Sequence, residues 1–106
     1  MIKIIDKKRY NTETAELLCA YTNGYFCNDL NYRSQDLYRT SKGAFFMHHE
    51  GGAMSDMGQS CGTNSVCGSE DIELLSEIEA RCFLEKHSKQ RDAQESLSKY
   101  FNIEDA

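Results

Sequence analysis

The sequence of 106 residues contains no proline and no tryptophan, and none of its apolar stretches approaches the roughly 20 residues that a membrane-spanning helix needs. Its first residues, Met1 to Asp6, lack the apolar core of a secretory signal peptide. Cysteine occurs five times, an odd number that cannot pair into a complete disulfide framework. Together these features predict a soluble protein of the reducing cytoplasm.

Positive charge is also scarce. The 12 basic residues face 17 acidic ones, which gives a formal net charge of −5 and a pI near 5.1. The acidity is concentrated in residues 70–106, where ten acidic residues accompany five basic ones. This balance argues against direct contact with nucleic acid and suits a protein partner that has a basic surface.

The organisation of the chain predicts one domain, residues 1–106, because there is no internal repeat and no linker, and the length allows one modest core. Apolar residues predict an opening strand at residues 2–5, which ends at a charged stretch. Residues 12–24 fit both a helical and an alternating pattern, and we favour a strand because it can pair with the hairpin that follows. Residues 25–36 are predicted to be a connection.

The most informative segment is a predicted β-hairpin over residues 37–50. Its residues alternate on both sides of a turn around Gly43, and Phe45 or Phe46 must be buried because a hairpin without a buried face would not hold. The neighbouring His48 and His49 are expected to point to opposite sides of the strand.

Residues 51–69 hold five of the seven glycines and are predicted to be a long loop with little structure of its own. A loop of this length in a compact domain is usually functional or mobile. Glu50, Asp56 and Glu70 in and beside it could form a carboxylate pair, although acidic residues beside a flexible loop are usually solvated.

The C-terminal part predicts a last strand at residues 72–75 followed by two helices. Ser76 and Glu79 have the spacing of a capping box for the first helix, and Asp92 with Glu95 predicts the start of the second. The expected fold class is therefore α+β: a small antiparallel β-sheet with a central hairpin and two C-terminal helices packed on it.

A family resemblance rests on four different segments of the chain: residues 10–15, 37–52, 60–65 and 75–80. The second segment reads Leu-Tyr-Arg-Thr-x-x-Gly-x-Phe-Phe-x-His-x-Glu-Gly-Gly. In these segments the chain resembles a small bacterial family carried on phages and integrative mobile elements, and it differs from that family at Met47, His49 and Leu74. The resemblance implies a role in the life of a mobile element, such as the inhibition of a host defence system.

A chemical alternative rests on His48, His49 and Glu50 with Cys61 and Cys67, which are residue types that bind zinc. Structural zinc sites use ligand pairs two to four residues apart, whereas five residues separate the two cysteines, so the spacing argues against zinc. Cys61 beside a hairpin histidine could instead act as nucleophile and base. The alternative is thus a small metal- or cysteine-dependent enzyme or regulator.

We interpret the chain as a non-enzymatic protein without a cofactor that binds another protein and inhibits a host defence system, for example a CRISPR effector. It is expected to be a monomer or a weak homodimer. A third interpretation is an accessory protein of the mobile element. Inhibition can be steric, through the hairpin and loop, or by DNA mimicry, through the helix carboxylates. The residues predicted to contact the partner are Tyr38, Arg39, His48, Glu50, Asp56, Glu77, Glu85 and Glu95.

Overall fold

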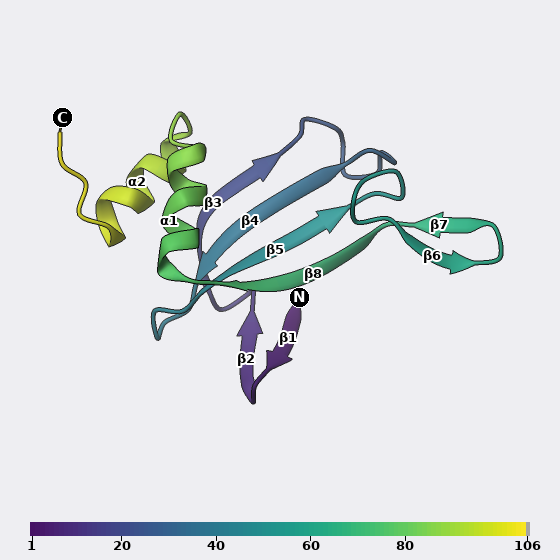
Figure 1. Ribbon diagram of the computed structural model, residues 1–106, viewed down its shortest axis with the longest axis horizontal. Coiled ribbons are helices and arrows are strands. Elements are labelled where there is room, and N and C mark those ends of the chain that lie inside the picture. The colour runs from purple at the N-terminus through teal and green to yellow at the C-terminus, as the bar shows by residue number, and fades with distance from the viewer. Residues whose placement is uncertain (106) are drawn as a thin grey trace.

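The computed structural model describes residues 1–105, which form an α+β fold of eight strands and two helices (Figure 1). A four-stranded antiparallel sheet has the order β3-β4-β5-β8, and β1-β2 and β6-β7 form two small hairpins. The predicted fold class, with two C-terminal helices packed on an antiparallel sheet, is confirmed. The elements are β1 (Ile2–Ile5), β2 (Lys8–Asn11), β3 (Glu16–Thr22), β4 (Arg33–Arg39), β5 (Phe45–Gly51), β6 (Gln59–Gly62), β7 (Ser65–Cys67), β8 (Ser69–Leu75), α1 (Glu77–Lys86) and α2 (Arg91–Tyr100).

The central sheet is apolar on both faces because successive side chains of a strand point to opposite sides. One face carries Leu37, Phe45 and Met47, which pack against both helices. The other face carries Phe46 and Ile72, which are covered by the β1-β2 hairpin. We call these the helix face and the hairpin face. Both phenylalanines of the central hairpin are therefore buried, each in a different cluster.

The N-terminus of α1 is formed by the predicted capping box. The Ser76 hydroxyl accepts a hydrogen bond from the Glu79 backbone N–H at 3.1 Å, and the Glu79 carboxylate accepts one from the Ser76 backbone N–H at 3.0 Å. Two backbone donors that have no partner within the helix are satisfied in this way. The first turn also holds Glu77, whose charge is favourable next to the positive end of the helix dipole.

Ser76→Ala is expected to lower the free energy of unfolding by about 1 kcal/mol, because the mutation removes this cap. Urea denaturation measures the change. Ser98→Ala is the matched control: Ser98 is an exposed residue of α2 and should stay within about 0.5 kcal/mol of the original protein. Equal effects of the two substitutions would show that the capping box contributes nothing.

The second helix does not begin as predicted. It starts at Arg91 with Gln90 as its N-cap residue, and no side-chain cap is formed there. The Asp92 carboxylate instead accepts a hydrogen bond from the Ala20 backbone N–H at 3.0 Å, and the Ser96 hydroxyl donates to the Leu18 carbonyl at 2.6 Å. These side chains of α2 satisfy the open edge of β3, where an unpaired row of backbone groups would otherwise invite another strand.

Three further predictions from the sequence need correction. The charged stretch after β1 is a turn followed by β2, with Asp6 and Lys7 at positive φ, so the opening strand is half of a hairpin. The predicted connection at residues 25–36 ends early, because β4 begins at Arg33. The glycine-rich segment contains the β6-β7 hairpin and is not a structureless loop. The favoured strand within residues 12–24 is confirmed as β3.

A bulge at Leu18 explains why the pattern of residues 12–24 was ambiguous. The pairing of β3 with β4 shifts between Leu17 and Cys19, so both Leu18 and Cys19 join the core on the helix face while Leu17 is half exposed.

Within residues 1–105, no helix has the length and apolar character needed to cross a membrane.

Candidate functional site

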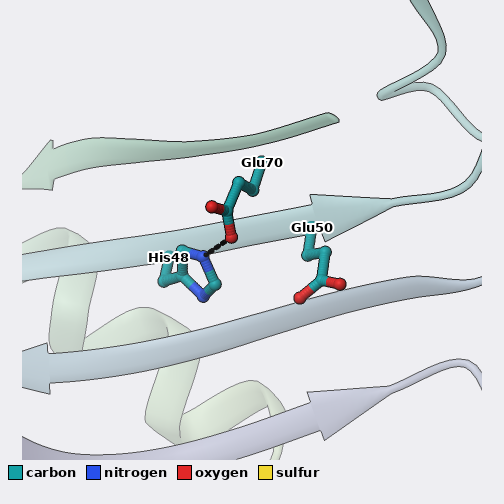
Figure 2. Close-up of side chains that lie close together, drawn as sticks. All are labelled: His48, Glu50 and Glu70. Atoms are coloured by element: carbon teal, nitrogen blue, oxygen red, sulfur yellow. Dashed lines mark hydrogen bonds and ion pairs between the residues drawn. The ribbon is translucent and has the colours of Figure 1, made fainter. Parts of the chain in front are cut away.

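A histidine and three carboxylates meet on the hairpin face of the sheet. The register of the strands places them: Asp36 and Ile72 flank His48, and in the next row Ser34 and Glu70 flank Glu50. Figure 2 shows His48 and Glu50 on β5 and Glu70 on the neighbouring β8. We call His48, Glu50, Glu70 and Asp36 the carboxylate–histidine cluster.

The imidazole of His48 lies between two of the carboxylates. Its Nε2 atom donates to Glu70 Oε2 at 3.0 Å, and its Nδ1 atom lies 4.0 Å from Asp36 Oδ2. One nitrogen or oxygen atom from each of His48, Glu50 and Glu70 lies within 4.8 Å of the others. The His48 side chain is only 12% exposed, which holds the ring in place between its neighbours.

The charges of the cluster are poorly balanced. Among the described residues, no lysine or arginine forms an ion pair with Asp36, Glu50 or Glu70; the nearby Lys3 bonds to Asp71 and to the Ile72 carbonyl. Burial raises the pKa of the Asp36 carboxyl, His48 opposes this effect, and the Glu50 carboxylate adds to it. Negative charge on Asp36 is therefore costly in the folded protein.

Asp36→Asn is expected to raise the melting temperature at pH 7. The pKa of Asp36 is raised in the folded protein, so the aspartate lowers the stability of the fold once the pH exceeds 3.8, the ordinary pKa of the side chain. This loss of stability grows as the pH rises towards the raised pKa. Below pH 3.8 both side chains are neutral and the difference should vanish. Thermal unfolding in the presence of a chelator, recorded from acidic to neutral pH, measures this dependence.

Asp71→Asn is the control of opposite sign. A hydrogen bond from Lys3 lowers the pKa of the Asp71 carboxyl, so this substitution should lower the melting temperature at pH 7. A loss of stability in both variants would contradict the cost assigned to the Asp36 charge.

His49 lies on the helix face, as the alternation predicts. Its Nδ1 atom accepts a hydrogen bond from Arg33 Nη2 at 2.8 Å, and its Nε2–H donates to Glu73 Oε1 at 3.0 Å. Because a guanidinium can only donate, this arrangement fixes the tautomer of the ring. Arg33 also bonds to Asp56 Oδ1 at 2.7 Å, so Arg33, His49, Glu73 and Asp56 form a network in which one guanidinium offsets part of the charge of two carboxylates.

The zinc or cysteine centre considered from the sequence is not assembled. Cys61 and Cys67 are exposed on the β6-β7 hairpin, where a hydrogen bond with Cys61 raises the pKa of the Cys67 thiol. The hydrogen bonds of His48 and His49 go to carboxylates and to Arg33, not to a thiol. Cys19 is buried, and burial raises its pKa to about 12, which suits a packing role.

Tyr38 and Arg39, two of the residues predicted to contact a partner, lie on opposite faces of the sheet. Tyr38 stacks on Phe46 with 5.2 Å between the ring centroids and is partly buried, and burial raises the pKa of its hydroxyl. The guanidinium of Arg39 lies over the Tyr100 ring, 4.3 Å from its centroid. Both side chains therefore contribute to packing within the protein.

The three helix glutamates predicted to contact a partner are all exposed. Glu85 pairs with Arg81 at 3.2 Å and Glu95 pairs with Arg91 at 3.1 Å, each across one helical turn. Glu77 belongs to the first turn of α1. Since two of the three carboxylates have a neutralising partner, the helix surface is less negative than its acidic residues alone indicate.

A surface of which the sequence predicted only one of two loops lies at the end of the sheet away from the helices (Figure 1). Two loops, residues 23–32 and 52–58, are joined there by hydrogen bonds from Gly52 N–H to the Tyr32 carbonyl at 2.9 Å and from Met54 N–H to the Leu30 carbonyl at 2.7 Å. Apolar side chains of both loops are exposed, with Phe26 84% exposed. We call this the loop surface; its apolar side chains are Tyr25, Phe26, Leu30 and Met54.

No protein-family model, curated protein or solved structure matches this chain.

A basic hollow of about 360 Å³ lies between the β1-β2 hairpin and the turn that joins β4 to β5. Its walls include Lys8, Arg9 and Lys42 together with the hydroxyl groups of Thr14 and Ser41. No carboxylate lines it, so it contrasts with the carboxylate–histidine cluster on the same protein.

Proposed function

We propose that the protein is a non-enzymatic inhibitor that binds a protein of a host defence system and blocks it sterically, a CRISPR effector being the target that the resemblance suggests. The observation that carries the proposal is the loop surface. Aromatic and large aliphatic side chains contribute most of the binding energy of protein interfaces, and their exposure is costly without a partner to cover them.

The structure of the two loops supports a rigid binding surface. Gly52 packs so closely on the carbonyls of Asp29 and Leu30 that a side chain there would lie 2.5 Å from both oxygens. The Ser55 hydroxyl donates to the Gly52 carbonyl at 2.7 Å, which fixes the second loop. Loops held in one conformation lose less entropy when they bind.

The charges of the molecule favour the steric mode over DNA mimicry. A mimic of DNA needs a dense and unpaired array of negative charge, whereas the net charge is −5 and arginines neutralise Glu85 and Glu95. Exposed ion pairs of this kind contribute little to affinity and act on the rate of association. Asp56, with its side chain 73% exposed at the edge of the loop surface, can add a polar contact to an apolar interface.

An interference assay in cells tests the proposal. A set of bacterial strains, each with one type of CRISPR effector, is transformed with a plasmid that the effector targets. Expression of the protein should restore transformation, in at least one strain, to the level of a plasmid without the target sequence. The double substitution Phe26→Ser with Leu30→Ser should abolish the restoration, because it removes two exposed apolar side chains of the loop surface without touching the core.

Ile78→Ser is the matched control. Ile78 is also exposed and apolar but lies on α1, so its substitution should leave inhibition unchanged. The proposal fails if no strain regains transformation, or if the loop variant inhibits as well as the original protein.

A further inference from the structure

We propose that His48, Glu50 and Glu70 bind a divalent transition-metal ion, with Mn²⁺ as the ion whose chemistry fits the three side chains best. The inference is independent of the proposed inhibition, because it concerns the hairpin face and not the loop surface. It also departs from the expectation of no cofactor that the sequence alone gave.

The geometry of the donor atoms is close to that of a metal site. Ligands about 2.1 Å from one ion lie roughly 3–3.5 Å from each other, and the donor atoms of the three residues already lie within 4.8 Å of one another. Figure 2 shows the Glu50 and Glu70 carboxylates beside the His48 ring, with Glu70 bonded to the ring and Glu50 farther from it. Small rotations of two glutamate side chains would bring all three atoms into contact with one ion.

Asp36 lies on the side of the His48 ring where metal-binding histidines usually have a supporting carboxylate. A histidine that binds a metal through one ring nitrogen commonly directs the other towards a carboxylate, which orients the ring. His48 directs Nε2 towards Glu70 and Nδ1 towards Asp36, which approaches to 4.0 Å. The four residues come from three adjacent strands, so the pairing register of a regular sheet holds them in position.

The unbalanced charge distinguishes this cluster from the network around His49. Three carboxylates surround His48 without an arginine or lysine partner among the described residues, whereas the network around His49 contains Arg33, which pairs with Asp56. A divalent cation would remove the repulsion between the carboxylates. Because it takes the place of the proton on Nε2, its binding should weaken as the pH falls.

The types of ligand indicate the class of ion. Two carboxylates favour hard ions such as Mn²⁺ and Mg²⁺, and an imidazole favours transition metals over Mg²⁺ and Ca²⁺. Exposed cysteines elsewhere on the protein would capture softer ions such as Zn²⁺. Mn²⁺ is therefore also the cleanest probe of the cluster.

Titration with Mn²⁺, followed by the electron paramagnetic resonance signal of the free ion, tests the site. The protein should remove one equivalent of Mn²⁺ from solution. The loss of a side chain that only supports a metal ligand weakens metal binding by roughly 10- to 100-fold. Glu70→Gln removes a ligand and should weaken Mn²⁺ binding by at least as much, and His48→Ala should abolish it. Glu70→Gln keeps the shape of an exposed side chain, so this variant should fold normally.

A second histidine–glutamate pair on the same two strands provides matched controls. Glu73 is exposed like Glu70 and also bonds to a histidine, but that histidine is on the other face. Glu73→Gln and His49→Ala should bind Mn²⁺ as the original protein does. The proposal is overturned if the original protein binds no Mn²⁺, or if Glu70→Gln and Glu73→Gln bind it equally well.

Discussion

Phe46→Ala is expected to lower the free energy of unfolding by about 3–5 kcal/mol, a large share of the 5–15 kcal/mol that stabilises a typical domain. Phe46 is fully buried on the hairpin face, stacks on Tyr38, and forms a T-shaped pair with the Tyr10 ring at a centroid distance of 5.7 Å. The ring thus joins the central sheet to the β1-β2 hairpin, and its removal leaves a cavity between them. Urea denaturation measures the loss, provided that the m-value, the dependence of the free energy of unfolding on urea concentration, is unchanged.

Phe26→Ala is the control for this substitution. It removes the same side chain from an exposed position on the loop surface and should change the free energy of unfolding by less than about 0.5 kcal/mol. Similar losses at the two positions would contradict the division between a phenylalanine that stabilises the fold and one that is available for binding.

Gly52→Ala is expected to abolish inhibition and to free the two loops from each other. A methyl group at this position would lie 2.5 Å from the carbonyl oxygens of Asp29 and Leu30, which are backbone atoms and can move only together with their loop. The loops must separate, and the hydrogen bonds of the Gly52 and Met54 amides should break. Amide hydrogen exchange at these two positions, together with the interference assay, measures the effect.

Gly62→Ala shows whether any added methyl group in this part of the chain is harmful. A side chain at Gly62 would meet no atom closer than 3.8 Å, so this variant should inhibit normally. If Gly52→Ala keeps full inhibition and slow exchange at Met54, the loop surface does not depend on the contact between the two loops.

Local patterns predicted those parts of the fold that depend on neighbouring residues. The capping box of Ser76 and Glu79 needs only a spacing of three residues, and the turn around Gly43 needs only a residue that adopts positive φ. The alternation of the hairpin likewise placed His48 and His49 on opposite faces. Each of these features is decided within a few positions of the chain.

The errors arose where distant parts of the chain decide the structure. Asp92 has the spacing of a helix cap, but it bonds to the edge of β3, whose position the sequence near Asp92 does not reveal. Asp36 was missed because β4 was expected to begin later. Had the strand been extended back from the turn, the register that pairs Arg39 with Phe45 would have placed Asp36 opposite His48.

The first loop of the loop surface, residues 23–32, escaped prediction for a related reason. Tyr25, Phe26 and Leu30 lie in a segment without periodicity, so nothing in the sequence indicates whether these side chains are buried or exposed. The side chains are exposed in the folded protein, where the loop backbone packs on Gly52, a contact between segments far apart in the chain. The predicted partner residues Tyr38 and Arg39 show the converse, since each packs on another side chain of the protein.

Hydrogen exchange of the protein, free and in complex with the effector that the interference assay identifies, tests the central claim most directly. We predict that residues 23–32 and 52–58 exchange rapidly in the free protein, apart from the bonded amides, and become protected in the complex. The exposed faces of α1 and α2 should show no change. Protection confined to the two helices, or no protection at the loops in a complex that still forms, would contradict the account.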